Sequence, residues 1–482
     1  MKKKNILFAV SEALPFIKTG GLADVAGTLP YYFDKKKFDV RVILPKYACM
    51  KQELKEKLKY KFFTFVDLAW RNQYVGVFEA KINGITFYFI DNEYYFSSDA
   101  PYGEIRGDIE KFAYFCRAIF KVLPQLDFKP DLIHCHDWQS ALIPVYLKDQ
   151  FCKEDFYKDT KTLLTIHNLK FQGVYGSDIV EDVLGLSMNY FTEGKIENNG
   201  CVNLLKGGLY FADKISTVSE TYAEEIRTHE FGEGLNSFVS YREQDLFGIV
   251  NGIDYDFFNP ETDKAIFENY SLETVKEGKI KNKLALQREL GLFQDENVFT
   301  IGIVSRLTDQ KGFDLIGAVL DEICQTNIQL IVLGSGENHF EQMFYDLKNR
   351  YPDKISITVG YNEELSHKIY AACDGFLMPS RFEPCGLSQL IALRYGTIPI
   401  VRKTGGLKDT VIAYSDDEKA SNGFSFASYD AYSLIQQIYS AEKLFYENKE
   451  SWNQLVLRAM KSDSSWNNSA KKYEKIYSQM LK

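Results

Sequence analysis

Short apolar runs alternate with amphipathic stretches through most of the chain, most regularly in the second half. Short apolar runs bounded by polar or glycine-containing segments are typical of buried parallel strands. Such runs predict strands at Val298–Val304, Ile328–Leu333, Lys354–Val359, Gly375–Met378 and Thr397–Val401. Apolar positions at helical spacing predict helices between them, at Gly312–Cys324, His339–Arg350 and Glu363–Cys373.

The first half shows the same alternation with more interruptions. Strands are predicted at Asn5–Val10, Val40–Leu44, Asp131–His136, Thr162–Ile166, Lys214–Val218 and Phe247–Gly252, and helices at Ile109–Val122 and Ser140–Leu147. The segment Lys61–Asp91 is rich in strand-forming residues, and Asn83-Gly84 within it predicts a hairpin turn. The segment Asp178–Asn203 is polar and interrupted, which indicates a surface excursion.

Strands that alternate with helices predict right-handed parallel units and an α/β fold with two Rossmann-like, doubly wound sheets. The polar segment from Asp254 to about Asn297 looks like the connection between two domains, residues 1–252 and 253–482. Ligands of such sheets bind at the carboxyl ends of the strands. Two domains facing each other would then enclose a deep central cleft. The last helix, about 465–482, is expected to pack back on the N-terminal domain.

Composition narrows the class of protein. The 482 residues suffice for two or three domains, and an apolar content of 45% is typical of a well-filled globular protein. A net charge of −9 argues against nucleic acid as the partner. The eight cysteines are scattered without a C-x-x-C pair, which indicates reduced thiols in a cytoplasmic protein. No apolar stretch is long enough to predict a membrane span.

The segment Ser380–Leu390 carries the first candidate chemistry. It lies between the predicted strand Gly375–Met378 and a predicted helix that ends near Gly396. A tight strand-to-helix turn leaves backbone N–H groups free to bind phosphate, and Gly386 lets the backbone approach closely. Glu383 would repel a phosphate but can accept hydrogen bonds from sugar hydroxyls. The turn therefore predicts a nucleotide-sugar site.

Two basic residues, Arg306 and Lys311, follow the predicted strand Val298–Val304. The strand direction delivers both to the same sheet edge as Glu383. A guanidinium and an ammonium group suit a diphosphate and can stabilise the charge that grows as it leaves. The alternative is a solvated loop whose bases pair with nearby acids.

Two glycine-containing segments bear on phosphate binding. The pentapeptide Lys18–Leu22 recurs letter for letter as Lys403–Leu407, each time after a predicted strand, which suggests one glycine-rich loop per domain facing the cleft. The segment Leu333–His339 begins like a dinucleotide fingerprint, but His339 stands where the last glycine is expected. A tight strand-to-helix turn is the favoured interpretation there. The near match is the main support for an alternative function, a nicotinamide-dependent oxidoreductase.

Polar residues end several predicted strands of the first half. Asp137 and Trp138 follow one strand, His167 and Asn168 follow the next, and Asn251 ends a third. Side chains at these ends should face the cleft, which favours sugar contacts over a purely structural role.

Other motifs have simpler explanations. His134 and His136 alternate onto one strand face, which suggests metal ligands, but the sequence offers no partner set. The segment Asp254–Asp256 spells D-x-D, yet its position in the connection favours a turn with local capping. Tyr361, after the strand Lys354–Val359, suits either base stacking or core packing.

With these residues in view, the chain resembles the bacterial glycogen synthases, close relatives of the plant starch synthases. The resemblance rests on ordered motifs from the first strand to Val411: Lys18–Val25, His136–Trp138, His167-Asn168, Thr217–Ser219 with Tyr222-Ala223, Val250–Gly252, Ser305–Leu307, Gln310–Gly312, Pro379–Leu387 and Thr404–Leu407. It implies a GT-B fold and transfer of glucose from ADP-glucose to the non-reducing-end 4-OH of an α-1,4-glucan. It also implies retention of configuration, no metal and no other cofactor.

The resemblance also implies roles for individual residues. Arg306 and Lys311 would hold the diphosphate, and Glu383 with the amides of Cys385, Gly386 and Leu387 would anchor glucose and phosphate. Lys18 and Gly21 would approach the donor phosphates, and His167 would contact the transferred sugar. The remaining substrate-binding candidates come from the same motifs: Asp24, Asp137, Asn168, Asn251, Tyr361 facing adenine, Thr404, Gly405 and Gly406.

One departure and three alternatives remain open. The family often reads His-Asp-Trp-His, whereas this chain has Gln139, so an essential imidazole at that position is in doubt. The nearest alternative is a related transferase that uses UDP-glucose or a short acceptor. The others are the oxidoreductase and a catalytically silent glucan-binding protein.

Overall fold

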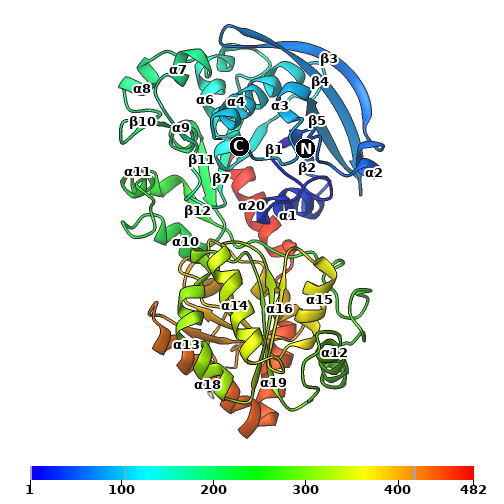
Figure 1. Ribbon diagram of the computed structural model, residues 1–482. Helices are drawn as coiled ribbons and strands as arrows, with labels where there is room; N and C mark the ends of the chain where they lie inside the picture. The colour runs from blue at the N-terminus through cyan, green and yellow to red at the C-terminus, as the bar shows by residue number, and fades with distance from the viewer. Residues whose placement is uncertain (1–2, 104, 416–418) are drawn as a thin grey trace. The chain divides into compact units, whose positions relative to one another are not determined.

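The structure is a computed structural model that describes residues 3–103, 105–415 and 419–482. The chain forms two compact units (Figure 1). Unit 1 contains Met1–Val218, Ala223–Ile249 and Trp466–Lys482, and unit 2 contains Ser219–Tyr222 and Val250–Ser465. The boundary was expected after residue 252, and in the structure unit 2 begins again at Val250, directly after Ile249 of unit 1. The short segment Ser219–Tyr222 also belongs to unit 2.

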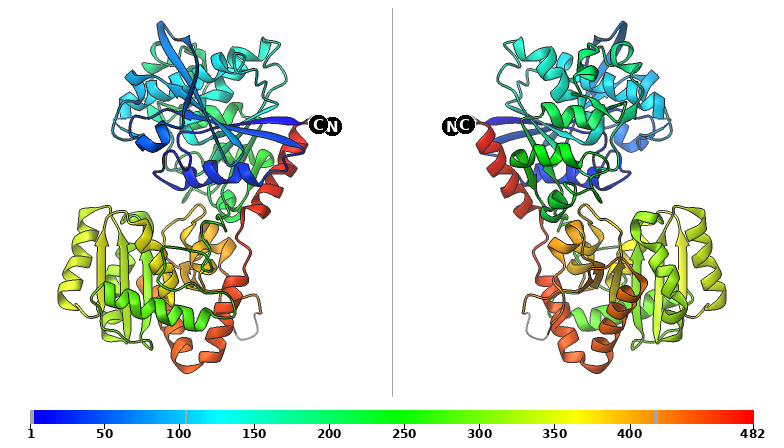
Figure 2. Two further views of the ribbon diagram at one scale, coloured as in Figure 1. Left: turned by 90° about the vertical axis from the view of Figure 1, so that its right-hand side faces the viewer. Right: turned by 90° about the vertical axis from the view of Figure 1, so that its left-hand side faces the viewer.

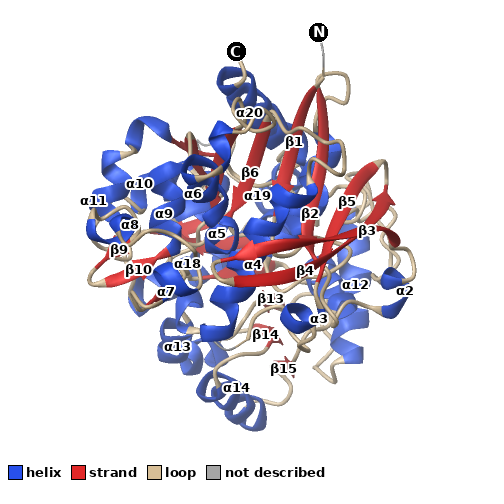
Figure 3. Cartoon of the chain, turned by 90° about the horizontal axis from the view of Figure 1, so that it is seen from above, coloured by secondary structure: helices blue, strands red, loops and turns tan. Residues whose placement is uncertain are grey.

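Unit 1 is built on a nine-stranded sheet in the order β12-β11-β7-β6-β1-β2-β5-β4-β3. The strands from β12 to β5 are parallel, and β4 is antiparallel to both β5 and β3. Figure 3 shows β3 and β4 continuing the sheet beyond β5. The strands are β1 (Lys4–Ala9), β2 (Phe38–Pro45), β3 (Lys59–Leu68), β4 (Arg71–Ile82), β5 (Ile85–Asp91), β6 (Leu132–His136), β7 (Lys161–Ile166), β11 (Lys214–Thr217) and β12 (Leu246–Gly248).

Helices cover both faces of this sheet, with α4 and α6 on one face and α1 and α20 on the other (Figures 1 and 2). The longer helices are α1 (Gly21–Thr28), α4 (Ile105–Val122), α6 (Leu142–Asp149), α9 (Leu204–Phe211) and α20 (Trp466–Met480). The shorter ones are η1 (Leu29–Tyr32), α2 (Gln52–Lys55), α3 (Glu93–Phe96), α5 (Asp137–Ser140), η2 (Phe151–Lys153), α10 (Glu220–Glu225), α11 (Asn236–Tyr241) and η3 (Glu243–Asp245).

The turn between β4 and β5 is the predicted Asn-Gly hairpin. Asn83 has φ 48° and Gly84 has φ 85°, so both central residues are in the left-handed region. A two-residue turn with positive φ at both positions matches the twist of antiparallel strands. The sequence prediction is confirmed here.

The segment Asp178–Asn203 holds more structure than a surface excursion. It contributes the helices α7 (Ile179–Asp182) and α8 (Asn189–Thr192) and the strands β9 (Glu197–Asn198) and β10 (Cys201–Asn203). With β8 (Val174–Tyr175) these strands form a separate antiparallel sheet in the order β8-β10-β9. The strands are too short for their hydrophobic periodicity to be read from sequence.

Helix α20 completes unit 1 from the far end of the chain. Tyr477 donates or accepts a 2.8 Å hydrogen bond with Nδ1 of His134 on β6, and its ring lies 5.4 Å from that of Phe33. Tyr473 and Tyr477 are fully buried. These aromatic contacts hold the amphipathic helix against the parallel sheet.

Unit 2 is a six-stranded parallel sheet in the order β15-β14-β13-β16-β17-β18. Counted along the chain, this is the 3-2-1-4-5-6 order of a doubly wound dinucleotide-binding sheet. The strands are β13 (Phe299–Val304), β14 (Ile328–Gly334), β15 (Ile355–Val359), β16 (Gly375–Met378), β17 (Ile398–Arg402) and β18 (Phe424–Phe426). All five strands predicted for the second half are confirmed to within two residues.

The helices of unit 2 cover both faces of its sheet. They are α12 (Val275–Glu289), η4 (Asp309–Lys311), α13 (Phe313–Gln325), α14 (Asn338–Arg350), α15 (Glu363–Ala372), α16 (Ser388–Arg394), α17 (Gly405–Thr410), α18 (Ala431–Glu447) and α19 (Lys449–Lys461). Strand β14 shows why its sequence is apolar without interruption. Leu330 and Val332 join the core cluster that includes α13 and α14, whereas Ile331 and Leu333 join the cluster that includes α12 and α15.

The polar segment Asp254–Asn297 is more than the connection predicted from its composition, because it contains α12. Lys279 and Lys283 of this helix are buried: Lys279 donates to the Ala371 carbonyl at 3.0 Å, and Lys283 pairs with Asp374 at 2.6 Å. Burial lowers the pKa of Lys279 to about 7. The sequence analysis predicted no helix in this connection, and tertiary contacts make the lysines of α12 part of the interior.

The D-x-D motif in the same segment forms a turn, as predicted. The Oδ1 atom of Asp254 accepts hydrogen bonds from the amides of Asp256 and Phe257 at 2.9 and 3.3 Å. That carboxylate caps its own turn. Among the described residues, no helix has the length and apolar character needed to cross a bilayer.

Candidate active site

The candidate site of unit 2 lies where the strand order reverses. Strands β13 and β16 are neighbours in the sheet, and their connections run to opposite sides. This switch point leaves a crevice at the carboxyl ends of the two strands, where doubly wound sheets bind ligands. Arg306 and Lys311 follow β13, and Glu383 follows β16, so all three sequence-predicted residues belong to this edge.

Lys311 and Glu383 are in direct contact. The Nζ atom of Lys311 lies 2.6 Å from Oε2 of Glu383, and the Oγ atom of Ser380 donates to the same oxygen at 3.0 Å. Glu383 is only 6% exposed. A nearly buried carboxylate with two partners has a fixed orientation, which is what a group that must position a sugar requires.

The two loops that carry this pair are joined by their backbones. The amide of Arg381 donates to the Gln310 carbonyl at 2.9 Å, and the Gln310 side chain donates to the Phe382 carbonyl at 3.2 Å. Gly312 has φ 76°, and a Cβ there would lie 2.2 Å from the Pro379 carbonyl oxygen. Glycine therefore permits the close approach that brings Lys311 to Glu383.

Arg306 differs from Lys311 in forming no ion pair with the described residues. It is exposed and directly follows β13, and no described residue forms an ion pair with its guanidinium. A cation without a protein partner at the ligand-binding edge of the sheet can bind an anion without first breaking a contact.

The turn after Glu383 presents free donors. No described protein acceptor takes a hydrogen bond from the amides of Cys385, Gly386 and Leu387, which precede the first residue of α16. Gly386 has φ 72°, in the left-handed region that favours glycine. Such a run of unpaired amides can bind phosphate oxygens.

Asn251 lies beside this turn. Its backbone is hydrogen-bonded to the thiol of Cys385, whose pKa is raised to about 12 by burial. Asn251 is 6% exposed, and its Oδ1 atom has no partner among the described residues. A buried amide oxygen without a donor is uncommon in folded proteins and indicates a place for a donor from a ligand or water.

The second copy of the repeated pentapeptide packs against the backbone of the Glu383 turn. The Gly406 amide donates to the Glu383 carbonyl at 3.1 Å, and Thr404 is fully buried. A Cβ at Gly405 would lie 1.9 Å from the Glu383 carbonyl oxygen, and one at Gly406 would lie 2.0 Å from that of Cys385. The glycines of this copy are thus required by backbone packing.

Tyr361 occupies the same edge of the sheet at a distance of two strands from β13. It follows β15, the edge strand, after Gly360 with φ 127°, and its side chain is 79% exposed. Exposure excludes the core-packing alternative for Tyr361.

Unit 1 has its own switch point, between β1 and β6. Glu12 follows β1, Asp137 follows β6, and His167 with Asn168 follows β7. The Oδ1 atom of Asp137 accepts a hydrogen bond from the His167 amide at 2.7 Å. Desolvation by the surrounding protein raises the pKa of the Asp137 carboxyl to about 7. The structure therefore brings together the polar strand ends of unit 1 that the sequence singled out.

The histidines next to this edge are used in hydrogen bonds. His136 Nδ1 lies 2.9 Å from His167 Nε2, and His134 bonds Tyr477 and, through Nε2, Thr165 Oγ1 at 2.6 Å. Burial lowers the pKa of all three imidazoles, that of His167 to about 3. The paired rings account for the His134 and His136 alternation without a metal, and they leave His167 a neutral hydrogen-bonding group.

Glu12 is a site residue that the sequence reasoning missed. It is 3% exposed, and its Oε2 atom accepts hydrogen bonds from Thr19 N and Oγ1 at 2.5 and 2.8 Å. Burial raises the pKa of its carboxyl to about 7. Glu12 thereby holds the first glycine-rich loop, in which Lys18 pairs with Asp24 at 2.8 Å and Gly21 begins α1. The sequence offered one signal for Glu12, namely its position shortly after the first predicted strand.

Trp138 and Gln139, which follow Asp137 in α5, are both largely buried. Trp138 is 9% exposed, its ring lies 5.2 Å from that of Phe112, and a Cβ at Gly173 would lie 2.6 Å from it. Gln139 is equally buried. Asp137, directly before Trp138, has φ 54°. The sugar contact of Trp138 stays a prediction.

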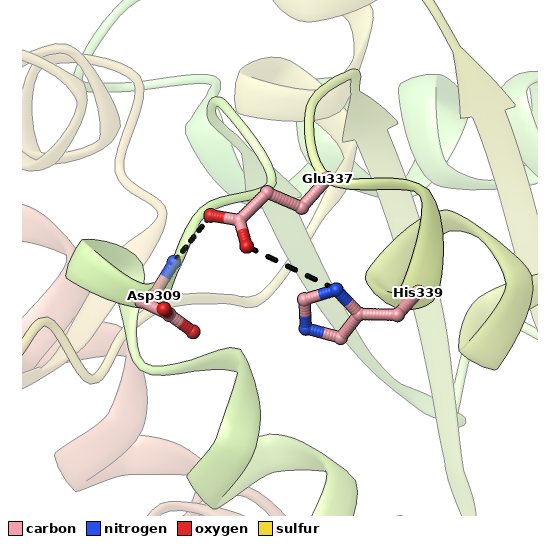
Figure 4. A group of neighbouring side chains, drawn as sticks. All are labelled: Asp309, Glu337 and His339. Carbon is pink, nitrogen blue, oxygen red and sulfur yellow. Dashed lines mark hydrogen bonds and ion pairs between the residues drawn. The ribbon is translucent and has the colours of Figure 1, made fainter.

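The glycines of the near-fingerprint form a tight strand-to-helix turn, as predicted. A Cβ at Gly334 would lie 1.9 Å from the Ser305 carbonyl oxygen, and one at Gly336 would lie 2.2 Å from that of Leu307. Beside this turn, side-chain ligand atoms of Glu337, His339 and Asp309, the first residue of η4, lie within 4.8 Å of one another (Figure 4). All three are exposed, and Glu337 contacts both the Asp309 amide and His339, so a surface network accounts for this cluster.

Comparison with known proteins agrees with this geometry. Residues 5–241 match the family described as starch synthase catalytic domain, and residues 285–455 match glycosyl transferases group 1. The catalytic domain of starch synthase IV from Arabidopsis thaliana, bound to ADP and acarbose, superimposes with a TM-score of 0.92 at 33% identity over 100% of both chains. The fold and the candidate site define a two-domain glycosyltransferase of the GT-B class.

Sequence relatives give the particular family. A glycogen synthase of Lachnospira eligens is 56% identical over 99% of this chain and 100% of its own length. One of Lachnoclostridium phytofermentans is 52% identical over 98% of this chain and 99% of its own length. The chain belongs to the glycogen synthase family and is a glucosyltransferase of glycogen biosynthesis. The oxidoreductase alternative is thereby wrong.

Proposed function

We propose that this enzyme transfers glucose from ADP-glucose to the non-reducing-end 4-OH of an α-1,4-glucan, with retention of configuration. The observation that carries the proposal is the ion pair of Lys311 with Glu383 at the switch point of unit 2, where Arg306 follows the same strand as Lys311. The Arabidopsis relative bound to ADP supports an adenine nucleotide as the leaving group. Eight free thiols fit a cytoplasmic enzyme.

The donor is assigned to unit 2. Arg306 and Lys311 bind the diphosphate, and the amides of Cys385, Gly386 and Leu387 bind phosphate oxygens. Glu383 accepts hydrogen bonds from glucose hydroxyls, a role that suits its fixed orientation. Tyr361 stacks on adenine, for which its exposed ring is suited. Asn251, Thr404, Gly405 and Gly406 shape and support the turn that carries Glu383.

Further substrate contacts are assigned to residues of unit 1. Lys18 and Gly21 approach donor phosphates, with Asp24 orienting Lys18 through its ion pair. His167 contacts the transferred glucose as a neutral hydrogen-bonding group. Asp137 holds the His167 backbone, and Asn168 follows at the same strand end.

In the chemical step the acceptor O4 forms a bond to C1 of glucose while the bond from C1 to the phosphate oxygen of ADP breaks. The acceptor approaches on the face from which ADP leaves, and its proton passes to the departing phosphate oxygen. Negative charge grows on ADP as the bond breaks. Arg306 and Lys311 are the groups that stabilise this charge.

The test is release of ADP from ADP-glucose, measured with and without glycogen. We expect release to depend on glycogen and to be much slower with UDP-glucose. Equal turnover of both donors would replace the ADP-glucose assignment with the UDP-glucose alternative. Donor hydrolysis that ignores glycogen would contradict the polymer as acceptor.

The residue assignments are tested separately. Each of the variants Arg306→Ala, Lys311→Ala and Glu383→Ala should lower turnover by about a hundredfold, since one charge-stabilising group is worth roughly 3 kcal/mol. Arg306→Lys should recover only part of the loss, because lysine keeps the positive charge but lacks the planar donor geometry of the guanidinium. Near-normal turnover in all three alanine variants would refute the assignment.

A further inference from the structure

Gln389, in the first turn of α16, makes contacts that no step of the proposed reaction explains. Its side chain is fully buried, and its Nε2 atom donates to the carbonyls of Cys385 and Gly386, both at 3.0 Å. Nε2 also lies 3.2 Å from Thr410 Oγ1. Because a carbonyl only accepts hydrogen bonds, the Nε2 end of the amide must be the end that faces the two carbonyls. Gln389 therefore fixes the direction of two carbonyl groups in the Glu383 turn.

A carbonyl that is held on one side of a peptide plane directs the next amide to the other side. The peptide bonds of this turn are trans, so the C=O of one residue and the N–H of the next point in opposite directions. The Cys385 carbonyl thus sets the direction of the Gly386 amide, and the Gly386 carbonyl sets that of the Leu387 amide. Neither amide has a described protein acceptor. One buried side chain orients two of the three donors assigned to phosphate.

The third donor, the amide of Cys385, is oriented in the same way. The Pro384 carbonyl accepts hydrogen bonds from Oγ of Ser219 at 2.6 Å and from the Gly406 amide at 3.2 Å. Ser219 belongs to the short segment Ser219–Tyr222 of unit 2 and is fully buried. This contact gives a role to the Thr217–Ser219 motif, which the sequence alone left without one. Each carbonyl that precedes one of the three unpaired amides is thus held by a protein donor.

The backbone of the turn also curves around one point. Gly386 has φ 72°, in the left-handed region, and Leu387 has φ −113° and ψ −31°, in the right-handed region. Successive residues of opposite hand turn their N–H groups toward a common point, an arrangement that binds anions. A Cβ at Gly386 would lie 2.3 Å from Oε1 of Gln389. Glycine therefore lets Gln389 pack directly against the turn that it holds.

The support has a chemical purpose. Without the Gln389 amide, the carbonyls of Cys385 and Gly386 would lose their donor, and their peptide planes could rotate toward other donors or water. Such a rotation would turn the Gly386 and Leu387 amides away from a bound phosphate. Donors that are already aligned need no reorganisation when negative charge grows on the leaving group.

We propose that Gln389 and Ser219 are positioning residues for the diphosphate of the donor. They do not touch the ligand, but they hold the peptide planes of the Glu383 turn so that three amides point at phosphate oxygens. The inference rests on the proposed function, which assigns these amides to phosphate. It adds that phosphate binding depends on two buried side chains behind the turn. Their loss should therefore weaken phosphate-bearing ligands selectively.

The test compares the affinity of the enzyme for ADP and for adenosine, measured by isothermal titration calorimetry. Gln389→Met keeps a side chain of similar length and removes its hydrogen-bond donors. We expect the Kd for ADP to rise about tenfold, roughly the loss of one hydrogen bond to a charged group, while the Kd for adenosine stays within about twofold. Equal weakening of both ligands, or unchanged binding of ADP, overturns the inference.

The matched control is Gln287→Met. Gln287 is also a fully buried glutamine of unit 2, and its Nε2 atom donates to the Asp295 carbonyl at 3.0 Å and to Gln329 Oε1 at 2.9 Å. Gln329 lies at the amino end of β14, whereas the donor turn follows the carboxyl end of β16 in the same parallel sheet. The control should lose stability in urea but keep its affinity for ADP. Equal weakening of ADP binding in both variants overturns the specific role of Gln389.

Kinetics supply a readout that a loss of stability alone would not move. In Gln389→Met the KM for ADP-glucose should rise about tenfold and the KM for glycogen should stay unchanged. An equal rise in both KM values overturns the inference.

Ser219→Ala gives the same comparison if Gln389→Met does not fold. The Gly406 amide still donates to the Pro384 carbonyl in that variant, so the effect should be smaller, about threefold for ADP and none for adenosine. Unchanged ADP binding in Ser219→Ala overturns the inference. An unmodified enzyme that binds no ADP would instead refute the proposed donor site.

Discussion

The Nζ atom of Lys311 lies 2.6 Å from Oε2 of Glu383, although 72 residues separate them in the chain. The contact exists because β13 and β16 are neighbours in the sheet, and each residue follows one of these strands. In the proposed donor site, Lys311 binds the diphosphate and Glu383 binds the sugar. Loss of either residue should therefore affect both parts of the proposed donor site.

Removal of Lys311 should impair both catalysis and stability. In Lys311→Ala, Glu383 remains nearly buried without its cation, which costs about 3 kcal/mol of unfolding free energy. Turnover of ADP-glucose should fall by about a hundredfold. The matched control is Lys281→Ala, which breaks an exposed pair with Glu268 of the same 2.6 Å length and should cost less than about 1 kcal/mol. Equal turnover in the two variants would contradict the role of Lys311.

The two copies of the repeated pentapeptide should respond differently to the same substitution. Gly405→Ala places a methyl group 1.9 Å from the Glu383 carbonyl oxygen at φ 42°, and should destabilise unit 2 by about 3 kcal/mol. At the equivalent Gly20, a Cβ meets only Oε1 of Glu12 at 3.7 Å, and φ is −155°. Urea denaturation of both variants gives the comparison. Equal loss of stability would refute the close-packing explanation.

Glu12 should make stability fall as pH rises. In the native state its carboxyl keeps its proton up to a pKa of about 7, whereas in the unfolded chain it releases it near 4.5. Between these values the unfolded state binds fewer protons, so the unfolding free energy decreases with pH. The stability of the unmodified protein relative to Glu12→Gln should decline by about 3 kcal/mol from pH 4.5 to 7.

The control for Glu12 is Glu53→Gln, which changes an exposed glutamate of the same unit. Urea titrations of the three proteins at several pH values isolate the contribution of Glu12 from those of Asp137 and the buried histidines, because those groups are common to all three. A pH-independent difference between Glu12→Gln and the unmodified protein would contradict the assignment.

Lys279 should have the opposite effect at higher pH. Its pKa is about 7 in the native state and 10.5 when unfolded, so between these values the unfolded chain binds the extra proton. Stability should therefore rise from pH 7 to 10, by up to about 4 kcal/mol, and Lys279→Met should remove this rise. Lys281→Met, an exposed lysine on the same helix, should leave the slope unchanged. A flat profile in the unmodified protein would exclude a buried neutral amine.

Much of the fold could be predicted from local patterns. The apolar run Gly375–Met378 reflects burial of a strand on both faces, and the Asn83-Gly84 turn reflects backbone preferences. Both can be recognised from residues that are adjacent in the chain. Since strands point their carboxyl ends toward one edge of a parallel sheet, residues at strand tips such as Glu383 and His167 were also identifiable. Short strands with no periodicity, such as β9 and β10, were not.

The sequence by itself determined the order of strands and helices, and the family to which the chain belongs. Only the tertiary structure decided which strand tips meet, that Glu12 holds the first glycine-rich loop, and that Trp138 turns into the core. Tertiary structure also buried Lys279, in a polar segment that the sequence indicated only as a connection between domains. The physical reason is that strand pairing and burial depend on residues distant in the chain, whereas strand and helix formation depend largely on neighbours.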